Sequence, residues 1–581
     1  MWRPAHRHAV RAATLRRLFS GRDEARDAVK RKIRATITAL DEDGDAIGVS
    51  PDAPAHVRVP FAVPGDELNV DVWIRDLTSP RAASSPLFAE LQEILTPSAD
   101  RVDGRCDKFF GVCGGCKHQN VRYERQLAEK QRRIEELFAS WPSPLEIRDI
   151  IGVSTTIEQY NYRNKMEFTC STGRWLLESD KAGALEAGAL EVSDSENAPL
   201  PTFTLGLFPV SSVGTRRARA QKKRRAGRRA QWNSRILSID ECALQDEACN
   251  RLLARVGELC ESLGITAYDF HTHDGFLKNV VLRRGQVHDT SSSSSSSGRQ
   301  EIMLAFLTTT LQDAEQQQRL DQLVATIVAE SNTSEDSTSQ LVSVIQRVDE
   351  EARRHRQSDQ DKESEETRER VLHGDTFFHD SILGHRFQIS FDAFFQPNSA
   401  QATKLYHEIE RRLESRDGKR PVVWDLFCGV GSIGICLGPH VERLVGFELV
   451  DSAVHMARRN AALNGYSSDR MQFHRLDLSN HWRDVETQLL ERFHDPETRP
   501  DVIILDPPRA GLHKKLVALL KEQLPVPEIC YVSCNPVTQR RDLDLFCDSS
   551  DVASYTVEFL QPVDMLPHTP HIETIAWLRR R

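Results

Sequence analysis

The first hundred residues contain short runs in which hydrophobic and polar positions alternate with a period of two. The runs RATITAL, HVRVPFAV and GDELNVDVWIRD, between about residues 30 and 95, are separated by Gly, Asp and Pro. This pattern is typical of half-buried antiparallel strands joined by tight turns. We therefore predict a small antiparallel β-barrel over residues 29–98, an architecture that often binds nucleic acid.

The pattern changes in the last third of the chain, where whole runs are apolar. The stretches VVWDLFCGVGSIGICLG, DVIILDPPRAG and EICYVSCNP each end in a Gly, Pro or acidic loop, and helix-like segments such as SAVHMARRNAALNG alternate with them. Buried parallel strands that alternate with helices indicate a doubly wound α/β domain. We predict a Rossmann-like domain over residues 391–581, with its ligands beyond the carboxyl ends of the strands.

Residues 99–390 mix helix-like and strand-like pieces, and we predict a middle α+β domain there. Three polar stretches interrupt it, and their composition lacks the apolar residues of a core. We expect all three to be disordered insertions. They cover residues 215–230, 290–298 and 330–370.

Composition sets broad limits on the function. A chain of 581 residues with 39% hydrophobic and 28% charged residues is too long for one core and predicts a soluble protein of several domains. No apolar run approaches the roughly 20 residues of a membrane-spanning helix, so we predict no membrane partner. The net charge of −9 argues against a wholly basic nucleic-acid binder but leaves room for local basic patches.

Two segments are locally basic. Residues 1–28 contain six Arg before the first acid, Asp23, which favours a mitochondrial transit peptide over a plain basic tail, with cytoplasmic or nuclear localisation as the alternatives. In residues 215–230, nine of sixteen positions are Lys or Arg. That insert fits contact with RNA phosphates, a nuclear localisation signal or a solvated loop equally well.

A glycine-rich turn follows the first strand of the predicted α/β domain. Gly429, Gly431 and Gly434 form a G-x-G-x-x-G motif just after Phe427, and Glu448 ends the next strand. Glycines allow a tight turn and close approach of a ligand to the backbone, and the acid can accept hydrogen bonds from ribose hydroxyls. The motif fits a dinucleotide or S-adenosylmethionine, or a β–α turn without a ligand.

Two further loops carry reactive groups. Asp506 begins the stiff sequence Asp-Pro-Pro-Arg after one strand, and Cys534 ends another strand 28 residues later. Because both loops follow parallel strands, we expect them to be neighbours at the sheet edge. Cys534 is either a nucleophile or a buried structural thiol.

The segments FDAFFQPNSAQATKLY, DLFCGVGSIG, LDPPRAGL, VSCNP and PHIETIAWL together resemble the RNA 5-methyluridine methyltransferase family, which uses S-adenosylmethionine. The predicted barrel resembles the TRAM domain of many members. The resemblance implies that Cys534 is the nucleophile and Glu573 the base. It also implies a cofactor and uracil site lined by Gln396, Phe427, Ser432, Glu448, Asp477 and Asp506.

The chemistry of uracil-C5 methylation requires these residue types. A thiolate that adds at C6 makes C5 nucleophilic, and a base must later remove the C5 proton. Two assignments have simpler alternatives, because Glu573 lies in a strand pattern where it could face solvent, and Gln396 could cap the helix that begins near Ser399.

A cysteine group near the N-terminus, Cys106, Cys113 and Cys116, resembles the iron–sulfur segment of the bacterial ribosomal-RNA branch of the family. The resemblance implies a [4Fe–4S] cluster with Cys242 as the fourth ligand. Cys249 and Cys170 are the other candidates for that position. Structural zinc is the alternative to the cluster, and unligated thiols are a third possibility.

We therefore expect an RNA uracil-C5 methyltransferase, with transfer RNA slightly favoured over ribosomal RNA as the substrate. The alternatives are an RNA cytosine-C5 methyltransferase and a non-catalytic protein that binds or folds RNA. No protein partner is predicted.

Overall fold

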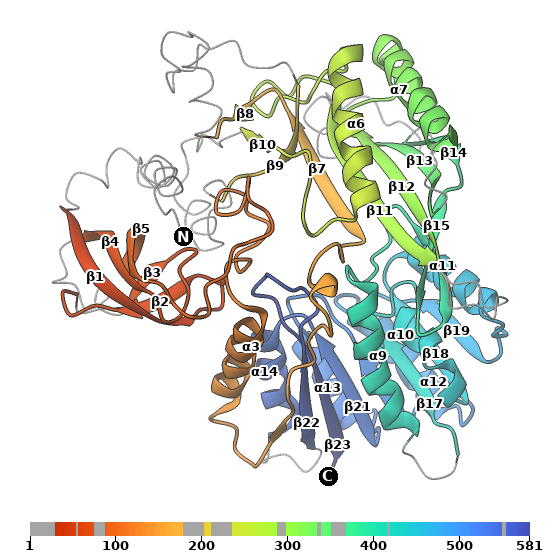
Figure 1. The fold of residues 1–581 in the computed structure, drawn as a ribbon. Coiled ribbons are helices and arrows are strands. Elements are labelled where there is room, and N and C mark those ends of the chain that lie inside the picture. The colour runs from red at the N-terminus through yellow and green to blue at the C-terminus, as the bar shows by residue number, and fades with distance from the viewer. Residues whose placement is uncertain are drawn as a thin grey trace, which may run out of the picture.

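The computed structural model describes residues 29–53, 56–74, 87–177, 203–210, 235–287, 298–333, 338–349, 368–414, 419–548 and 554–581. They form a small barrel, a middle domain and a C-terminal α/β domain (Figure 1). The predicted transit peptide, the basic insert and nearly all of the serine-rich stretch lie outside these residues. Within the described chain, no helix combines the length and the apolar character needed to cross a membrane.

The N-terminal strands close into a five-stranded barrel in the order β1-β2-β3-β5-β4, coloured red in Figure 1. The strands are β1 (Val29–Leu40), β2 (Ala46–Val49), β3 (Val57–Val59), β4 (Glu67–Ile74) and β5 (Leu87–Thr96). Alternate residues such as Ile33, Ala35 and Ile37 fill its interior, as the period-two pattern predicted. One pair differs from the predicted antiparallel barrel, because β3 and β5 close it in parallel.

The middle domain is an eight-stranded sheet in the order β14-β13-β12-β11-β7-β9-β10-β8. Its strands are β7 (Lys165–Ser171), β8 (Arg174–Trp175), β9 (Thr204–Leu207), β10 (Ile236–Ser238), β11 (Leu277–Val287), β12 (Arg299–Thr308), β13 (Ser339–Val348) and β14 (Glu369–Gly374). Helices α6 (Glu247–Leu263) and α7 (Ala314–Thr333) pack on one face. The hairpin of β15 (Phe377–Ile382) and β16 (His385–Ser390) packs on the other.

Strand β13 corrects one prediction. It lies within residues 330–370, where we expected disorder, and it pairs with both β12 and β14. Leu341, Val344 and Ile345 are buried there. Polar sequence on both sides of β13 made the whole stretch resemble a disordered insertion. Burial between β12 and β14 stabilises β13 as a strand despite this polar flanking sequence.

The C-terminal domain is an eight-stranded sheet in the order β19-β18-β17-β20-β21-β23-β22-β6, which confirms the predicted Rossmann-like domain. Its strands are β17 (Val422–Leu426), β18 (Arg443–Glu448), β19 (Met471–Arg475), β20 (Val502–Leu505), β21 (Glu528–Ser533), β22 (Tyr555–Val563), β23 (Glu573–Arg580) and β6 (Glu146–Ile147). From β19 to β21 neighbouring strands are parallel, whereas β21 and β23 are antiparallel.

Helices cover both faces of this sheet. Side chains of α9 (Ser399–Glu414), α10 (Ser432–Cys436) and α11 (Asp451–Leu463) share a core with one face. Those of α3 (Tyr123–Phe138), α12 (Trp482–His494), α13 (Lys514–Glu522) and α14 (Pro536–Phe546) share a core with the other. Neighbouring residues Val423 and Trp424 of β17 point into opposite cores, as a fully buried strand requires.

Helix α3 and strand β6 belong to this domain although they precede the middle domain in sequence, so the predicted boundary at residue 390 is too simple. Strand β6 pairs in parallel with β22. Lys130 of α3 makes a buried ion pair with Asp564, and the Tyr123 hydroxyl donates to the same carboxylate at 2.7 Å. The chain then enters the middle domain through Asn164, whose backbone N–H donates to the Pro397 carbonyl at 3.0 Å.

Candidate active site

The carboxyl ends of the parallel strands bring the predicted loops to one edge of the sheet. After β17 the backbone turns sharply, with Phe427 at φ 67° and Gly431 at φ 81°. The turn leads directly into α10, whose glycine at position 434 packs tightly on Leu444 of β18: a Cβ there would lie 2.6 Å from the leucine side chain. These glycines therefore hold the start of α10 close to the sheet, as the motif predicted.

Glu448 ends β18 beside this turn. One of its carboxylate oxygens accepts from the Gly429 N–H at 3.1 Å, and the other accepts from the Val450 N–H at 2.9 Å. Both bonds fix the direction of the carboxylate and leave further lone pairs for a ligand. Next to Glu448, the side chains of Leu449 and Val450 are about half exposed. They form a small apolar surface that the sequence pattern did not predict.

Ser432 and Asp477 lie at the starts of their own loops and helices. The Ser432 hydroxyl is 3.0 Å from the hydroxyl of Tyr406, which joins α10 to α9. The Asp477 carboxylate follows β19 and accepts from the N–H groups of Ser479 and Asn480 at 3.0 and 3.1 Å. Both residues thus stand at the carboxyl edge of the sheet, where they were expected.

Gln396 is buried in the segment between β16 and α9, and its backbone carbonyl accepts from the Asn164 side chain at 2.7 Å. It is not the cap of α9, because the Asn398 side chain accepts from the Gln401 N–H at 3.2 Å and takes that role. Phe394, two residues before Gln396, is 67% exposed. An exposed aromatic side chain next to a buried polar residue is typical of a ligand-binding surface, and the sequence motif did not reveal it.

Cys534 and Glu573 face each other at the junction of β21 and β23. The last paired position of these antiparallel strands joins Ser533 to Thr574, so Cys534 and Glu573 occupy the next opposed position. Glu573 is half-buried beside the thiol, so the alternative of a solvent-facing strand residue does not describe it.

A buried network fixes this strand junction. The Gln539 side chain of α14 donates to the carbonyls of Tyr531 at 2.9 Å and Thr574 at 3.3 Å. In return, the Thr574 hydroxyl donates to the Gln539 side-chain oxygen at 2.7 Å. Because all three residues are fully buried, these bonds hold the ends of β21 and β23 in register.

The loop of Asp506 is bonded to the loop of Cys534, as the parallel-strand argument predicted. The carbonyl of Arg509 accepts from the Asn535 side-chain amide at 3.0 Å and from the Thr538 hydroxyl at 3.2 Å. The Asn535 side chain also caps α14 by accepting from the Val537 N–H. Arg509 is thereby held next to Cys534.

The titratable groups around Cys534 shift one another's pKa values. Burial, followed by the carboxyl groups of Glu573 and Asp506, raises the pKa of the Cys534 thiol to about 11, whereas the charge and a hydrogen bond of Arg509 oppose this rise. Burial raises the pKa of Asp506 to about 7. Burial and then Asp506 hold the pKa of Glu573 well above its usual value, and Arg509 opposes them. Such shifts in neighbouring side chains are typical of catalytic groups.

The four predicted cysteine ligands also come together. Cys106, Cys113, Cys116 and Cys242 line one pocket of about 480 Å³, part of which is open solvent. Burial is the main cause that raises the pKa of the Cys113 and Cys116 thiols to about 12, and the nearby Cys242 contributes to the rise of both. Cys170 and Cys249, the other predicted candidates, are buried in the core of the middle domain and do not line this pocket.

Residues 380–581 match the family described as tRNA (Uracil-5-)-methyltransferase. The matched residues include Cys534 and Glu573 and make up 202 of the 581 residues of the chain. Two curated relatives, both named "Uncharacterized RNA methyltransferase", come from Chlorobaculum tepidum and Clostridium tetani. The first is 29% identical over 557 residues, 94% of this chain and 96% of its own length. The second is 29% identical over 489 residues, 84% of this chain and 86% of its own length.

A solved structure shares the fold of this protein. The tRNA (uracil-54, C5)-methyltransferase of Pyrococcus abyssi, in complex with S-adenosyl-L-homocysteine, is 22% identical and superimposes with a TM-score of 0.58. The match covers 94% of this chain and 100% of the Pyrococcus chain, so it includes the barrel and the middle domain as well as the catalytic sheet. The protein is an RNA methyltransferase, and the edge formed by Glu448, Asp506, Cys534 and Glu573 is its candidate active site.

Proposed function

We propose that this enzyme methylates C5 of a uracil in RNA, with S-adenosylmethionine as the methyl donor, Cys534 as the nucleophile and Glu573 as the base. The observation that carries the proposal is the opposed pair of Cys534 and Glu573 at the end of β21 and β23. A thiol and a carboxyl group in one pocket supply the two functions that methylation at C5 demands.

The reaction begins when the Cys534 sulfur, as the thiolate, forms a bond to C6 of the uracil. The electron pair of the C5–C6 double bond moves into an enolate, and C5 then takes the methyl group from the sulfonium of the cosubstrate. Glu573 removes the C5 proton, the C5–C6 double bond re-forms, and the thiolate leaves. The raised pKa of Glu573 makes its carboxylate a stronger base than an ordinary glutamate.

Arg509 is the group that favours the thiolate. It hydrogen-bonds to Cys534 and lowers the pKa of its thiol, against the effect of the two nearby carboxyl groups. Its carbonyl accepts hydrogen bonds from the side chains of Asn535 and Thr538. Asn535 directly follows Cys534, and Thr538 lies in the first turn of α14. The Asp-Pro-Pro-Arg loop therefore acts on the nucleophile through Arg509.

The residues around the glycine turn fit the cosubstrate. Glu448 retains acceptor capacity for ribose hydroxyls, and Leu449 and Val450 offer an apolar surface for the adenine ring. Phe427, Ser432, Asp477 and Gln396 complete the proposed binding residues. When bound, S-adenosylmethionine supplies an electrophilic methyl group, and the chain's own residues orient it towards the Cys534 pocket.

A covalent trap tests the mechanism. RNA that carries 5-fluorouridine is incubated with enzyme and S-adenosylmethionine and separated under denaturing conditions. Fluorine at C5 cannot be removed as a proton, so the protein–RNA bond should persist as a shifted band. The band should be absent in Cys534→Ala and present in Cys547→Ala, a control that removes a half-buried thiol outside the pocket. A band of normal intensity in Cys534→Ala would overturn the nucleophile assignment, and a trap with 5-fluorocytidine alone would favour the cytosine reaction.

We propose transfer RNA as the substrate class. The family description supports this choice, and so does the name of the Pyrococcus enzyme, which acts on uracil 54 of transfer RNA. The small barrel, which we take to be a TRAM-like domain, and the basic insert at residues 215–230 would contribute RNA contacts. Mapping of the trapped uridine after incubation with mixed transfer and ribosomal RNA tests the proposal, and a position in ribosomal RNA alone would contradict it.

We also propose that Cys106, Cys113, Cys116 and Cys242 hold a [4Fe–4S] cluster with a structural role. All four cysteines line one pocket, which supports a ligand that they share. Anaerobically purified protein should contain about four irons per chain, whereas stoichiometric zinc in their place would favour the alternative.

Mitochondrial import remains a proposal for residues 1–28, which are rich in Arg and contain no acid before Asp23. A fluorescent reporter fused to this segment should localise to mitochondria, and a uniformly cytoplasmic or nuclear signal would contradict the proposal.

A further inference from the structure

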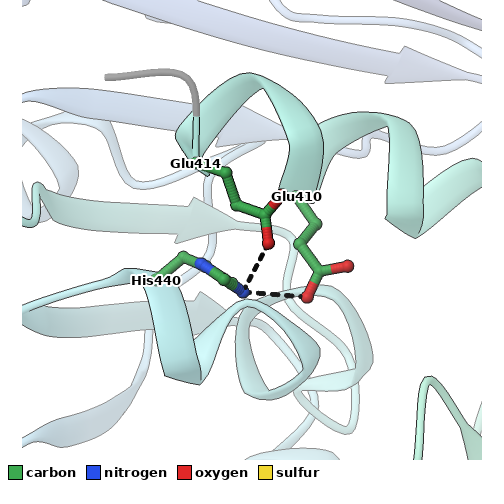
Figure 2. A group of neighbouring side chains, drawn as sticks. All are labelled: Glu410, Glu414 and His440. Atoms are coloured by element: carbon green, nitrogen blue, oxygen red, sulfur yellow. Dashed lines mark ion pairs between the residues drawn. The ribbon is translucent and has the colours of Figure 1, made fainter. Parts of the chain in front are cut away.

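Three side chains converge at the end of α9, away from the active site (Figure 2). Glu410 and Glu414 lie one turn apart on α9, and His440 belongs to the 3₁₀ turn η3 (Gly438–His440). The His440 Nε2 atom lies 3.0 Å from a carboxylate oxygen of Glu410 and 3.4 Å from one of Glu414. All three potential ligand atoms lie within 4.8 Å of one another.

Within the described part of the chain, His440 is the basic side chain that pairs with these two carboxylates, and neither pairs with a Lys or Arg. Arg411 pairs with Glu408, and Arg412 pairs with Glu558, so the arginines of the last turn point to other partners. Acids at positions i and i+4 of a helix repel each other. Both also lie near the carboxyl end of α9, where the helix dipole is already negative. One imidazole, even when protonated, balances only one of the two negative charges. A multivalent cation would reduce both the repulsion between the carboxylates and their unfavourable interaction with the helix dipole.

We propose that Glu410, Glu414 and His440 form a binding site for a zinc-class divalent metal ion. One imidazole nitrogen and two carboxylate oxygens are donors that zinc uses in proteins, at bond lengths of about 2.0–2.2 Å. A tetrahedral ion with such bonds places its donors about 3.4 Å apart, close to the observed separations of 3.0 and 3.4 Å. The imidazole disfavours calcium and magnesium, which prefer oxygen ligands.

The position of the site indicates a structural role. The end of α9 and the turn η3 lead into the amino ends of β17 and β18, whereas Cys534 follows the carboxyl end of β21. A metal ion would therefore act at the opposite edge of the sheet from the methylation chemistry. It would join α9 to η3, the turn that follows α10. The Tyr406–Ser432 contact joins α9 to α10 itself, next to the glycine-rich turn. The site would thus stabilise the frame of the cofactor pocket.

Zinc content and thermal stability test the site. Wild-type protein, Glu410→Gln and His440→Gln are dialysed against limiting zinc, and bound metal is measured by mass spectrometry. Glu408→Gln is the matched control, because it removes a carboxylate from the same helix that pairs with Arg411 instead. Any zinc in the cysteine pocket contributes equally to all four proteins. We expect wild type and the control to hold about one more zinc per chain than either triad variant.

The thermal measurement separates metal binding from a plain ion pair. Added zinc should raise the melting temperature of wild type and of Glu408→Gln, and magnesium at the same concentration should not. The triad variants should show no zinc-dependent shift. If Glu410→Gln does not fold, Glu414→Gln replaces it, because the Glu414 side chain is 51% exposed. Equal zinc content and equal zinc response in wild type and the triad variants would overturn the proposal and leave an ion pair only.

Discussion

Cys534 stands directly opposite Glu573, one position beyond the last paired residues of antiparallel strands β21 and β23. Because Cys534 directly follows β21, the register of these strands brings the thiol near the carboxyl group of Glu573, which raises the pKa of the thiol. A shift of β23 by one residue would turn the Glu573 side chain to the opposite face of the sheet. The buried Gln539–Thr574 bonds oppose such a shift.

Glu573→Gln should separate the two steps of the proposed reaction. Methylated RNA should remain bonded to the variant, because the C5 proton is not removed. The substitution also removes a negative charge beside Cys534, so the pH midpoint of thiol alkylation in the free enzyme should fall below the wild-type value of about 11. Rapid release of methylated RNA, together with an unchanged alkylation midpoint, would contradict both roles of Glu573.

Arg509→Gln should change the same midpoint in the opposite direction. Without the guanidinium, a smaller fraction of Cys534 is thiolate at any pH, so the alkylation midpoint rises and methyl transfer at neutral pH slows. Arg509→Lys keeps the positive charge and should recover part of the loss. If the glutamine and lysine variants alkylate at the wild-type pH, Arg509 does not activate the thiol.

Cys242→Ser should reduce the iron content of anaerobically purified protein, because Cys242 lines the same pocket as the three N-terminal thiols. Cys249→Ser is the matched control, since this neighbouring cysteine is buried in the core outside the pocket. Iron content and the visible absorbance of the cluster are the measurements. Loss of iron in Cys249→Ser but not in Cys242→Ser would show that Cys242 is not the fourth ligand.

Asp425→Asn should make the protein more stable at alkaline pH. Burial, followed by the nearby Asp506, raises the pKa of Asp425 to about 8 in the folded protein, whereas an unfolded chain ionises an aspartate near pH 4. The free energy of unfolding therefore falls as pH rises between these values. Melting temperatures of the variant and wild type should be similar at pH 4 and should diverge in favour of the variant by pH 8. Parallel pH profiles would contradict this prediction.

The sequence allowed the catalytic edge to be predicted because each motif directly follows an apolar strand. Parallel topology then brings Glu448, Asp506 and Cys534 to one edge without further information. Pattern alone did not reveal β13, whose few apolar residues lie between polar stretches. It also did not reveal that Asn398 rather than Gln396 caps α9, because capping depends on the local backbone path.

Other relationships depend on tertiary contacts between distant segments. His440 lies 26 residues beyond Glu414, and no spacing rule joins them. Strand β6 is only two residues long, and its partner β22 begins more than 400 residues later. A sequence period cannot report such a pairing, because it reflects which face is buried and not which segment covers it.

Asn164 connects the middle domain to the catalytic domain through both its backbone and its side chain. Its backbone donates to Pro397, and its side chain donates to the Gln396 carbonyl at 2.7 Å and the Ser399 hydroxyl at 2.9 Å. The chain enters the middle sheet here and returns to the same place before α9. An RNA that displaces the middle sheet must therefore either pull Gln396 along or break these buried bonds, so mechanical load on one domain reaches the pocket of the other.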